Sequence, residues 1–385
     1  MSARSRTTMG ALALAALAAA SAQAQQGPSL GGGAQVQSYT FGDGLGVERA
    51  TLYLLPMAYR HPFGDRLSLD LYGAYARGEV ALGGQGADTT YTLSGVVDTK
   101  IRANWTAAPW AVFSLALNLP TGNSGHSTEE AVVASILAND LLGFREANWG
   151  VGFGLTSGVA TAYRVGEWGV GVGASYRLAD EFEPRSDTSL SYSPGDEVRL
   201  RLALDRIVAG NKLTAGVSFQ RFSTDQLDRR DLFQAGNRWR GDVTYSFRTG
   251  RAATWTAYLS DVWRERGDLT LDVVDQGGAI VGDTLVRTGH QNLLIAGLAG
   301  AINVSPALGL RPAADLRVQT RSEGGGTGWL AGVGADFPYR LRPDLSVVPQ
   351  LRLQGGELDA ATPEGGTTVH GLFGAELGVT LRWTH

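Results

Sequence analysis

The sequence predicts an all-β protein: a transmembrane antiparallel up-and-down β-barrel of about 16 strands, or about 14 if one pair merges, with one short helix inserted in a loop. Three observations predict this fold. Apolar and polar side chains alternate along most of the chain, short turns alternate with long polar loops, and aromatic residues gather near the ends of the predicted strands.

The N-terminal stretch has the features of an export signal. Arg4 and Arg6 precede an apolar run over residues 9–20, and Ala22-Gln23-Ala24 supplies a small-residue cleavage site. We therefore expect a signal peptide over residues 1–24 and an outer-membrane barrel over residues 25–385. An N-terminal membrane anchor is the alternative, but the run is shorter than the roughly 20 residues that a spanning helix needs.

Period-2 segments follow one another to the C-terminus. The predicted strands cover residues 35–41, 47–59, 67–76, 91–105, 110–119, 148–163, 168–178, 197–208, 212–222, 238–248, 254–263, 286–303, 308–321, 329–340, 345–354 and 369–383. A hairpin signal, Asp43-Gly44, joins the first two. Two of these strands show the pattern clearly: Leu93, Val97 and Ile101 share one face, and Trp239, Val243 and Tyr245 share another.

The connections between the predicted strands alternate in length. Short turns fall at 61–66, 106–109, 164–167, 209–211, 249–253, 304–307 and 341–344, and longer polar loops lie between them. This rhythm is typical of an outer-membrane barrel with both termini in the periplasm. The loop at 264–285 carries a hairpin signal of its own around residues 275–278, so its strands are expected to extend beyond the membrane.

Tryptophan residues near strand ends separate this fold from a soluble one. They are Trp105, Trp110, Trp149, Trp168, Trp255, Trp329 and Trp383. A soluble propeller or long sandwich would explain the alternation of side chains. It would not explain an aromatic girdle or the alternation of short turns with long loops.

Residues 120–147 are the one stretch after the export signal that reads as a helix. Ser127 and Glu130 have capping-box spacing, and Gly143 stands where a glycine commonly follows a helix. One apolar face is expected, formed by Val133, Ile136, Leu137 and Leu141. Two placements are open: a plug that constricts the lumen, or a cap that packs on the outer loops.

The two strands after this insert are unusually rich in glycine on the face predicted to point inward. The glycines are Gly150, Gly152 and Gly154, followed by Gly169, Gly171 and Gly173. Glycine weakens a strand and removes side-chain volume, so something is expected to approach the wall there. The helical insert is the nearest candidate, and relief of barrel curvature is the alternative.

The lumen face is predicted to be polar and rich in arginine. Its charged residues include Asp98, Lys100, Arg102, Arg199, Arg201, Arg238, Arg240, Asp242, Arg317 and Asp336. One interpretation is a wall of mutually paired charges. The other is a selective lining in which the excess of basic groups favours anionic solutes.

A resemblance adds to this prediction. The motif Leu119-Pro120-Thr121-Gly122, the polar turn, the helix and the glycine-alternating strand after Trp149 resemble the bacterial outer-membrane transporter family of the MetA pathway of phenol degradation, which is grouped near the FadL-like hydrophobic-compound channels. The resemblance covers residues 100–175. It implies passive uptake of small hydrophobic or aromatic molecules without a cofactor. FadL-like channels also carry an N-terminal hatch, which this sequence lacks before its first predicted strand.

Other function classes find little support. The formal net charge of −4 gives no reason to expect a nucleic-acid partner, and the chain has no cysteine. The histidines are too dispersed for a metal site, so no catalytic residue, metal or cofactor is expected. Expected partners are outer-membrane lipid, lipopolysaccharide and a small-molecule solute, and the oligomeric state is left open. A channel narrowed by the insert is the first hypothesis. A structural or surface-interaction barrel with a closed pore is the alternative.

Overall fold

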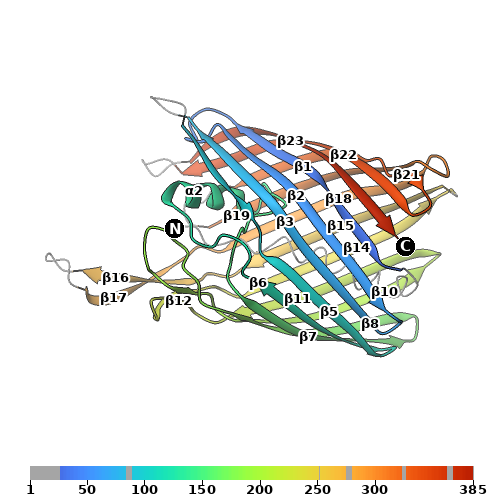
Figure 1. Cartoon of the computed structure of the whole chain (residues 1–385), viewed down its shortest axis with the longest axis horizontal. Coiled ribbons are helices and arrows are strands. Elements are labelled where there is room, and N and C mark those ends of the chain that lie inside the picture. The colour runs from blue at the N-terminus through green and yellow to red at the C-terminus, as the bar shows by residue number, and fades with distance from the viewer. Residues whose placement is uncertain are drawn as a thin grey trace.

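A computed structural model describes residues 27–83, 89–250, 252–274, 280–322, 327–361 and 367–384. It is a closed antiparallel barrel of 16 strands, as the sequence predicts (Figure 1). Two barrel strands are each interrupted once, so the wall contains 18 segments. These are β1 Ser29–Phe41, β2 Arg49–Phe63, β3 Leu67–Leu82, β4 Thr89–Val96, β5 Thr99–Ala108, β6 Ala111–Leu119, β7 Gly154–Val165, β8 Trp168–Ala179, β10 Glu197–Val208, β11 Asn211–Phe222, β14 Arg238–Thr249, β15 Ala253–Arg264, β18 Gln291–Asn303, β19 Gly309–Arg321, β20 Gly328–Asp336, β21 Tyr339–Arg342, β22 Leu345–Ala361 and β23 Thr367–Thr384.

The first and last strands close the barrel. β1 pairs antiparallel with β2 on one side and with β23 on the other, and Ser29 lies opposite both Arg60 and Thr384. Consecutive strands are joined by short turns at this end and by long loops at the other (Figure 1). The predicted alternation of connections is therefore confirmed. Both ends of the described chain lie on the side of the short turns.

The outer face of the wall is apolar. Leu55 and Met57 on β2, Leu200 on β10 and Leu377 on β23 are all exposed there, while the residues between them point into the barrel. Because a large, continuous apolar surface is not stable in water, this face is the one that contacts lipid, and the fold is a transmembrane barrel. No helix among the described residues is long and apolar enough to cross a membrane.

Aromatic rings border this face near the short turns. Trp105 stacks on Phe113 with ring centroids 5.7 Å apart, and Trp110 stacks on Tyr163 at 5.6 Å. Rings with one apolar and one polar side suit the level of the lipid headgroups. Trp149 does not belong to this group, which corrects the prediction: it is fully buried inside the barrel.

Many predicted strands have different limits in the structure, and at three of them the difference involves the insert or a long loop. The strand expected at 91–105 is broken at Val97 and Asp98, where the chain bends inward and the Asp98 N–H donates to the carbonyl of Trp149 (2.9 Å). The strand expected at 148–163 begins only at Gly154, because the carbonyl of Trp149 and the N–H of Val151 bond to Asp98 instead of to a neighbouring strand. The strand expected at 286–303 is divided, with residues 288–290 bending between a loop strand and the wall.

The long loops build a second sheet of five strands in the order β17-β16-β13-β12-β9. Its strands are β9 Tyr192–Ser193, β12 Asp225–Leu227, β13 Arg230–Gln234, β16 Asp268–Val274 and β17 Ile280–Arg287. The pairing of β16 with β17 confirms the expected hairpin, whose turn at 275–279 lies outside the described residues. This hairpin projects past the long-loop end of the barrel (Figure 1).

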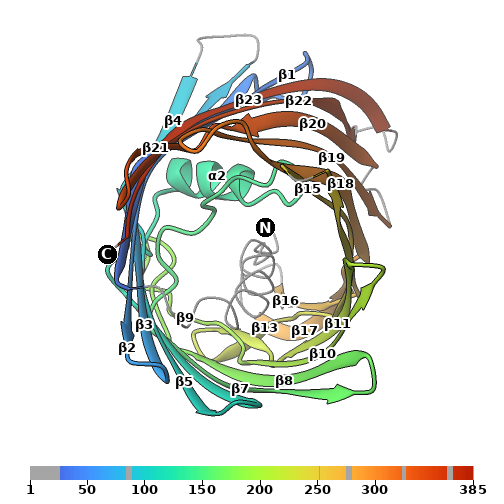
Figure 2. The same cartoon turned by 90° about the vertical axis from the view of Figure 1, so that its right-hand side faces the viewer.

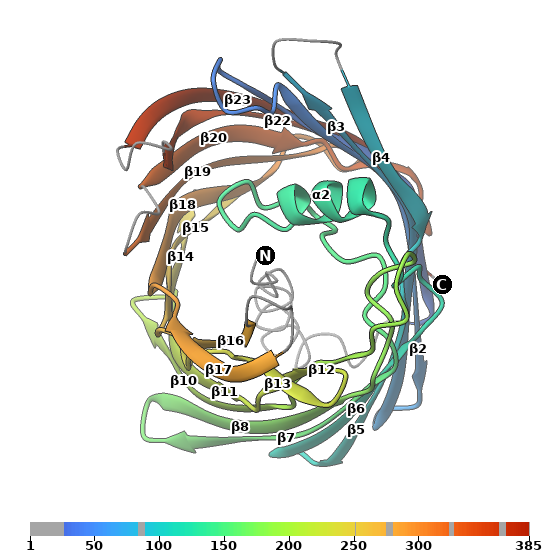
Figure 3. The ribbon, with the colours of Figure 1, turned by 90° about the vertical axis from the view of Figure 1, so that its left-hand side faces the viewer.

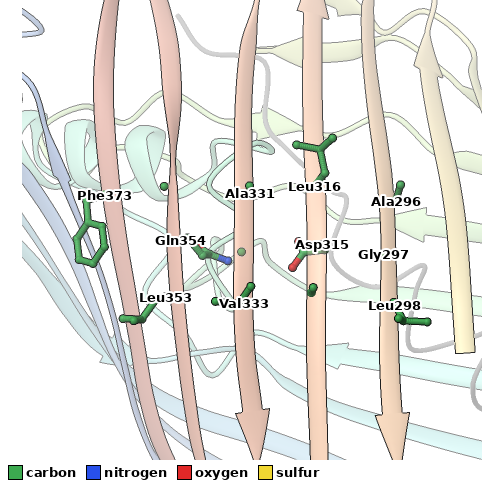
Figure 4. A pocket seen from close by; sticks show the side chains of 13 residues that line it. Ala296, Gly297, Leu298, Asp315, Leu316, Ala331, Val333, Leu353, Gln354 and Phe373 are labelled. Atoms are coloured by element: carbon green, nitrogen blue, oxygen red, sulfur yellow. The ribbon is translucent and has the colours of Figure 1, made fainter. Parts of the chain in front are cut away.

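A depression of about 660 Å³ lies on the outer surface of β18–β23. Leu316, Val333 and Phe373 rim it, and small residues such as Ala331 form its floor; the helix lies behind the wall in this view (Figure 4). Its rim lies on the lipid-facing side of the strands, and the inward-facing Asp315 and Gln354 also line it.

Candidate functional site

The predicted helix is present as α2 Thr128–Leu137, and it begins where the capping-box spacing predicts. Ser127 accepts a hydrogen bond from the N–H of Glu130 (3.2 Å), and the Glu130 carboxylate accepts one from the N–H of Ser127 (2.8 Å). This reciprocal capping box satisfies two backbone donors that the first turn leaves free.

The helix ends earlier than predicted, at the C-cap residue Ala138. The expected helix-ending glycine, Gly143, lies five residues further on, in a left-handed conformation (φ 61°). Leu141 is fully buried but also lies beyond the helix. The chain leaves the helix here because Asn139 accepts a hydrogen bond from the N–H of Leu141 (3.0 Å), which fixes a turn toward the opposite wall.

The insert lies inside the barrel. Both end-on views show α2 within the ring of strands (Figures 2 and 3), which decides between the two placements that the sequence leaves open. The helix packs on the inner face of β2, β3 and β4. A Cβ atom at Gly78 would be 2.5 Å from Leu137 Cδ1 and 3.0 Å from Val133 Cγ1, so this glycine permits the close approach of the helix.

The helix therefore does not lie on the glycine-rich strands β7 and β8, and the expected pairing is corrected. Gly169, Gly171 and Gly173 do point inward, since they lie opposite the inward-facing Asp205, Ala203 and Arg201 of β10. However, α2 packs against β2, β3 and β4 and not against β7 and β8, which carry these glycines.

Other segments approach the remaining glycines. Gly150 precedes the strand, and a Cβ atom there would lie 2.6 Å from the carbonyl carbon of Asn123 at the start of the insert. Gly152 has φ 75° and faces the side chain of Phe182, from a long loop. Gly154 begins β7 opposite Asn118. The close approach expected at this run is thus found at Gly150, made by the entry of the insert rather than by its helix.

The surface that receives the helix could have been found in the sequence. β2 and β3 carry apolar residues on both faces, which a strand between lipid and a water-filled lumen has no reason to do. The inward set is fully or nearly fully buried: Ala50, Leu52, Leu54, Ala76 and Val80, with Leu93 on β4. Strands that are apolar on both sides indicate that protein, rather than water, fills that part of the lumen.

Asp98 fastens both ends of the insert to the wall. Its carboxylate accepts hydrogen bonds from the N–H of Gly122 (2.9 Å), from the N–H of Val151 (2.8 Å) and from the amide of Asn118 (2.8 Å). The side chain is only 3% exposed. Asp98 is therefore a buried anchor rather than the open lumen charge that the sequence suggests.

Trp149 fills the space between the insert and β3. Its indole N–H donates to the carbonyl of Ala76 (3.2 Å), which satisfies the one polar atom of a fully buried ring. The ring also lies against Gly78. The insert thus returns to the wall at the same place where its helix packs.

Beyond the helix, the insert is bonded to the far wall. Asp140 pairs with Arg264 of β15 (2.8 Å) and accepts a hydrogen bond from Gln291 of β18 (3.3 Å). Arg317 of β19 donates to the carbonyls of Leu141 (3.2 Å) and Leu142 (3.0 Å). These bonds are charge-assisted and buried, which makes them stronger than ordinary surface contacts.

The rest of the insert is held by β1, β3 and β23. Gln37 accepts a hydrogen bond from the N–H of Arg145 (3.2 Å), whose guanidinium pairs with Glu376. Tyr39 donates to the carbonyl of Leu142 (2.6 Å). Burial raises the pKa of Glu146 above its usual range; Lys100 and a hydrogen bond from Tyr72 oppose this effect.

The other predicted lumen charges lie mostly on the opposite wall, and several are paired. Arg199 contacts Glu197 (2.7 Å), Arg201 contacts Asp242 (3.1 Å), and Arg240 lies 4.0 Å from the same carboxylate. Arg238 is placed over the ring of Phe222 (5.6 Å). Arg102 and Asp336 also face inward, opposite Asp70 and Arg311 respectively. None of the described residues forms a group of three or more metal-ligating side chains.

Comparisons with known proteins give no sequence relative: no family model and no curated protein matches the chain. Similar solved structures include the TodX monoaromatic hydrocarbon channel (TM-score 0.47, 10% identity, 94% of this chain and 91% of that one) and a FadL homologue from Pseudomonas aeruginosa (0.44, 8%, 92% and 89%). Another is an outer membrane channel from Pseudomonas putida F1 (0.38, 16%, 70% and 94%). At TM-scores below 0.5, these likenesses assign no substrate to this chain.

Proposed function

We propose that this protein is an outer-membrane channel that passes small molecules, including hydrophobic or aromatic ones, passively through a lumen narrowed by the insert at 120–147. Its termini would face the periplasm. One observation carries the proposal: the insert enters the lumen and is bonded to strands on both sides of it, from Asp98 on one wall to Arg264 and Arg317 on the other. A barrel with a purely structural role has no need of such a cross-brace in its interior.

A second candidate is a barrel with a closed pore whose loops bind a partner at the cell surface, in contact with lipopolysaccharide. The five-stranded loop sheet favours it, because ordered loops present a defined surface. Solute flux separates the two candidates.

Deletion of residues 127–143 tests the channel. Purified protein reconstituted in liposomes is expected to take up small uncharged solutes, and the deletion is expected to raise both the rate and the size limit, because it removes α2 and the segment that reaches Arg264. Liposome swelling with sugars of increasing size measures this. A circular-dichroism spectrum and heat-dependent gel mobility confirm that the deleted form is still a barrel. No flux in either form would contradict a channel and favour the closed barrel.

A further inference from the structure

Six inward side chains form one continuous row on the wall opposite α2, which we call the arginine row: Arg199, Gln220, Arg238, Arg264, Gln291 and Arg321. Each is the register partner of the next across β10, β11, β14, β15, β18 and β19. Neighbouring strands are about 4.8 Å apart, so the four guanidinium groups lie within reach of one another's ligands. Closure of a barrel does not require an arginine at the same height on four of its strands, so the row calls for another explanation.

The row has more positive charge than its neighbours neutralise. Arg199 pairs with Glu197 (2.7 Å) and Arg264 with Asp140 (2.8 Å). Within the described residues, neither Arg238 nor Arg321 has an ion pair with a carboxylate. The Arg238 Nε atom is buried without a hydrogen-bond partner, and Arg321 reaches only the amide oxygen of Gln319 (3.0 Å). Two guanidinium groups of the row thus carry a positive charge that no carboxylate of the described residues neutralises in an ion pair.

The insert itself shows what this row binds. Asp140 leaves the turn after α2 and places its carboxylate between Arg264 (2.8 Å) and the amide of Gln291 (3.3 Å), where only 4% of the side chain is exposed. A planar guanidinium fits a carboxylate with two parallel hydrogen bonds, so unoccupied groups beside Asp140 suit a second carboxylate of the same geometry.

We propose that the arginine row is a binding site for small organic carboxylates in transit, with Arg238 and Arg321 as its ligands. The carboxylate of Asp140 competes with such a solute for Arg264. This inference rests on the proposed channel function and narrows its solute class. An incoming carboxylate exchanges water for guanidinium donors at the narrow part of the lumen, while an uncharged solute of the same shape gains nothing there.

The test compares charge variants of the full-length protein in planar bilayers and liposomes. Arg238→Gln and Arg321→Gln are each expected to lower the chloride-to-potassium permeability ratio by about threefold, because each removes one charge close to the path. Arg102→Gln is the matched control: it removes an inward arginine of β5, outside the row. Its effect is expected to be clearly smaller. Asp140→Asn is expected to raise the ratio, since it removes the negative charge that pairs with Arg264.

Solute uptake identifies the ligand. Benzoate and benzyl alcohol have similar size and differ in charge, so Arg238→Gln is expected to slow benzoate uptake severalfold and to leave benzyl alcohol unchanged. Equal loss of both aromatic solutes would show a structural effect and overturn the proposal, as would equal effects of Arg102→Gln. An absence of flux in every form would instead contradict the channel function.

Discussion

Replacement of Asp98 by alanine is expected to release the insert from the wall while the barrel remains closed. The substitution removes the shared acceptor of the Gly122 and Val151 N–H groups, both inside the barrel. A buried donor left without a partner costs about 1–3 kcal/mol, so the loss of the acceptor for both donors should weaken docking of the insert by roughly 2–6 kcal/mol. The undocked fraction would then rise by more than about tenfold.

Two measurements report the release of the insert in Asp98→Ala. Limited proteolysis should cut within 127–143 much faster than in the parent protein, and bilayer recordings should show more frequent openings of high conductance. Asp205→Ala is a suitable control, because Asp205 also faces inward but its side chain is 48% exposed and its ion pair within the described residues is a long one, to Lys212 (3.9 Å). Parental rates of cutting and opening in Asp98→Ala would contradict the anchoring role.

Substitution of Gly122 by alanine is expected to separate the entry of the insert from the strand that returns from it. A Cβ atom there would overlap the carbonyl oxygen of Trp149 and lie 2.8 Å from its carbonyl carbon and 2.9 Å from the Asp98 nitrogen. These are backbone atoms, which cannot turn aside as a flexible side chain can. Overpacking of this kind costs about 1–3 kcal/mol.

Hydrogen exchange measures this effect at the atoms concerned. In Gly122→Ala, peptides that contain the amides of Asp98 and Val151 should exchange faster, because the bonds to Trp149 and Asp98 lengthen or break. Gly241→Ala is the matched control, since a Cβ atom there meets nothing within 4 Å. Equal exchange in the two variants would show that Gly122 is not needed for close contact.

Local patterns predicted the parts of this molecule that depend on neighbours in sequence. The alternation of side chains predicted the barrel, and the spacing of Ser127 and Glu130 predicted the start of α2, because a cap is formed within one turn. Strand 197–208 was predicted with the limits that β10 has. In each case the interaction that sets the structure lies within a few residues.

Long-range contacts decided what the sequence did not predict. Trp149 has the position of a girdle residue in the sequence, yet it is buried because Ala76 and Gly78, more than 70 residues earlier, make room for it. Asp98 looks like one more lumen charge, but its partners are backbone groups of the insert. The path of the insert beyond the helix likewise depends on the pairing of Asp140 with Arg264, more than 120 residues later, which no local signal contains.

A disulfide between the helix and the wall tests the central claim, that the insert lies in the lumen against β3. The chain has no cysteine, so Gly78→Cys with Val133→Cys can form only one intramolecular bridge. With a Cβ atom at Gly78 placed 3.0 Å from the Val133 side chain, the pair is expected to cross-link readily in membranes, detected by gel mobility without reductant. Gly173→Cys with Val133→Cys, which reports the glycine-rich strands instead, is expected not to cross-link. A bridge between the Gly173→Cys and Val133→Cys positions, with none at Gly78→Cys, would contradict the placement of the helix.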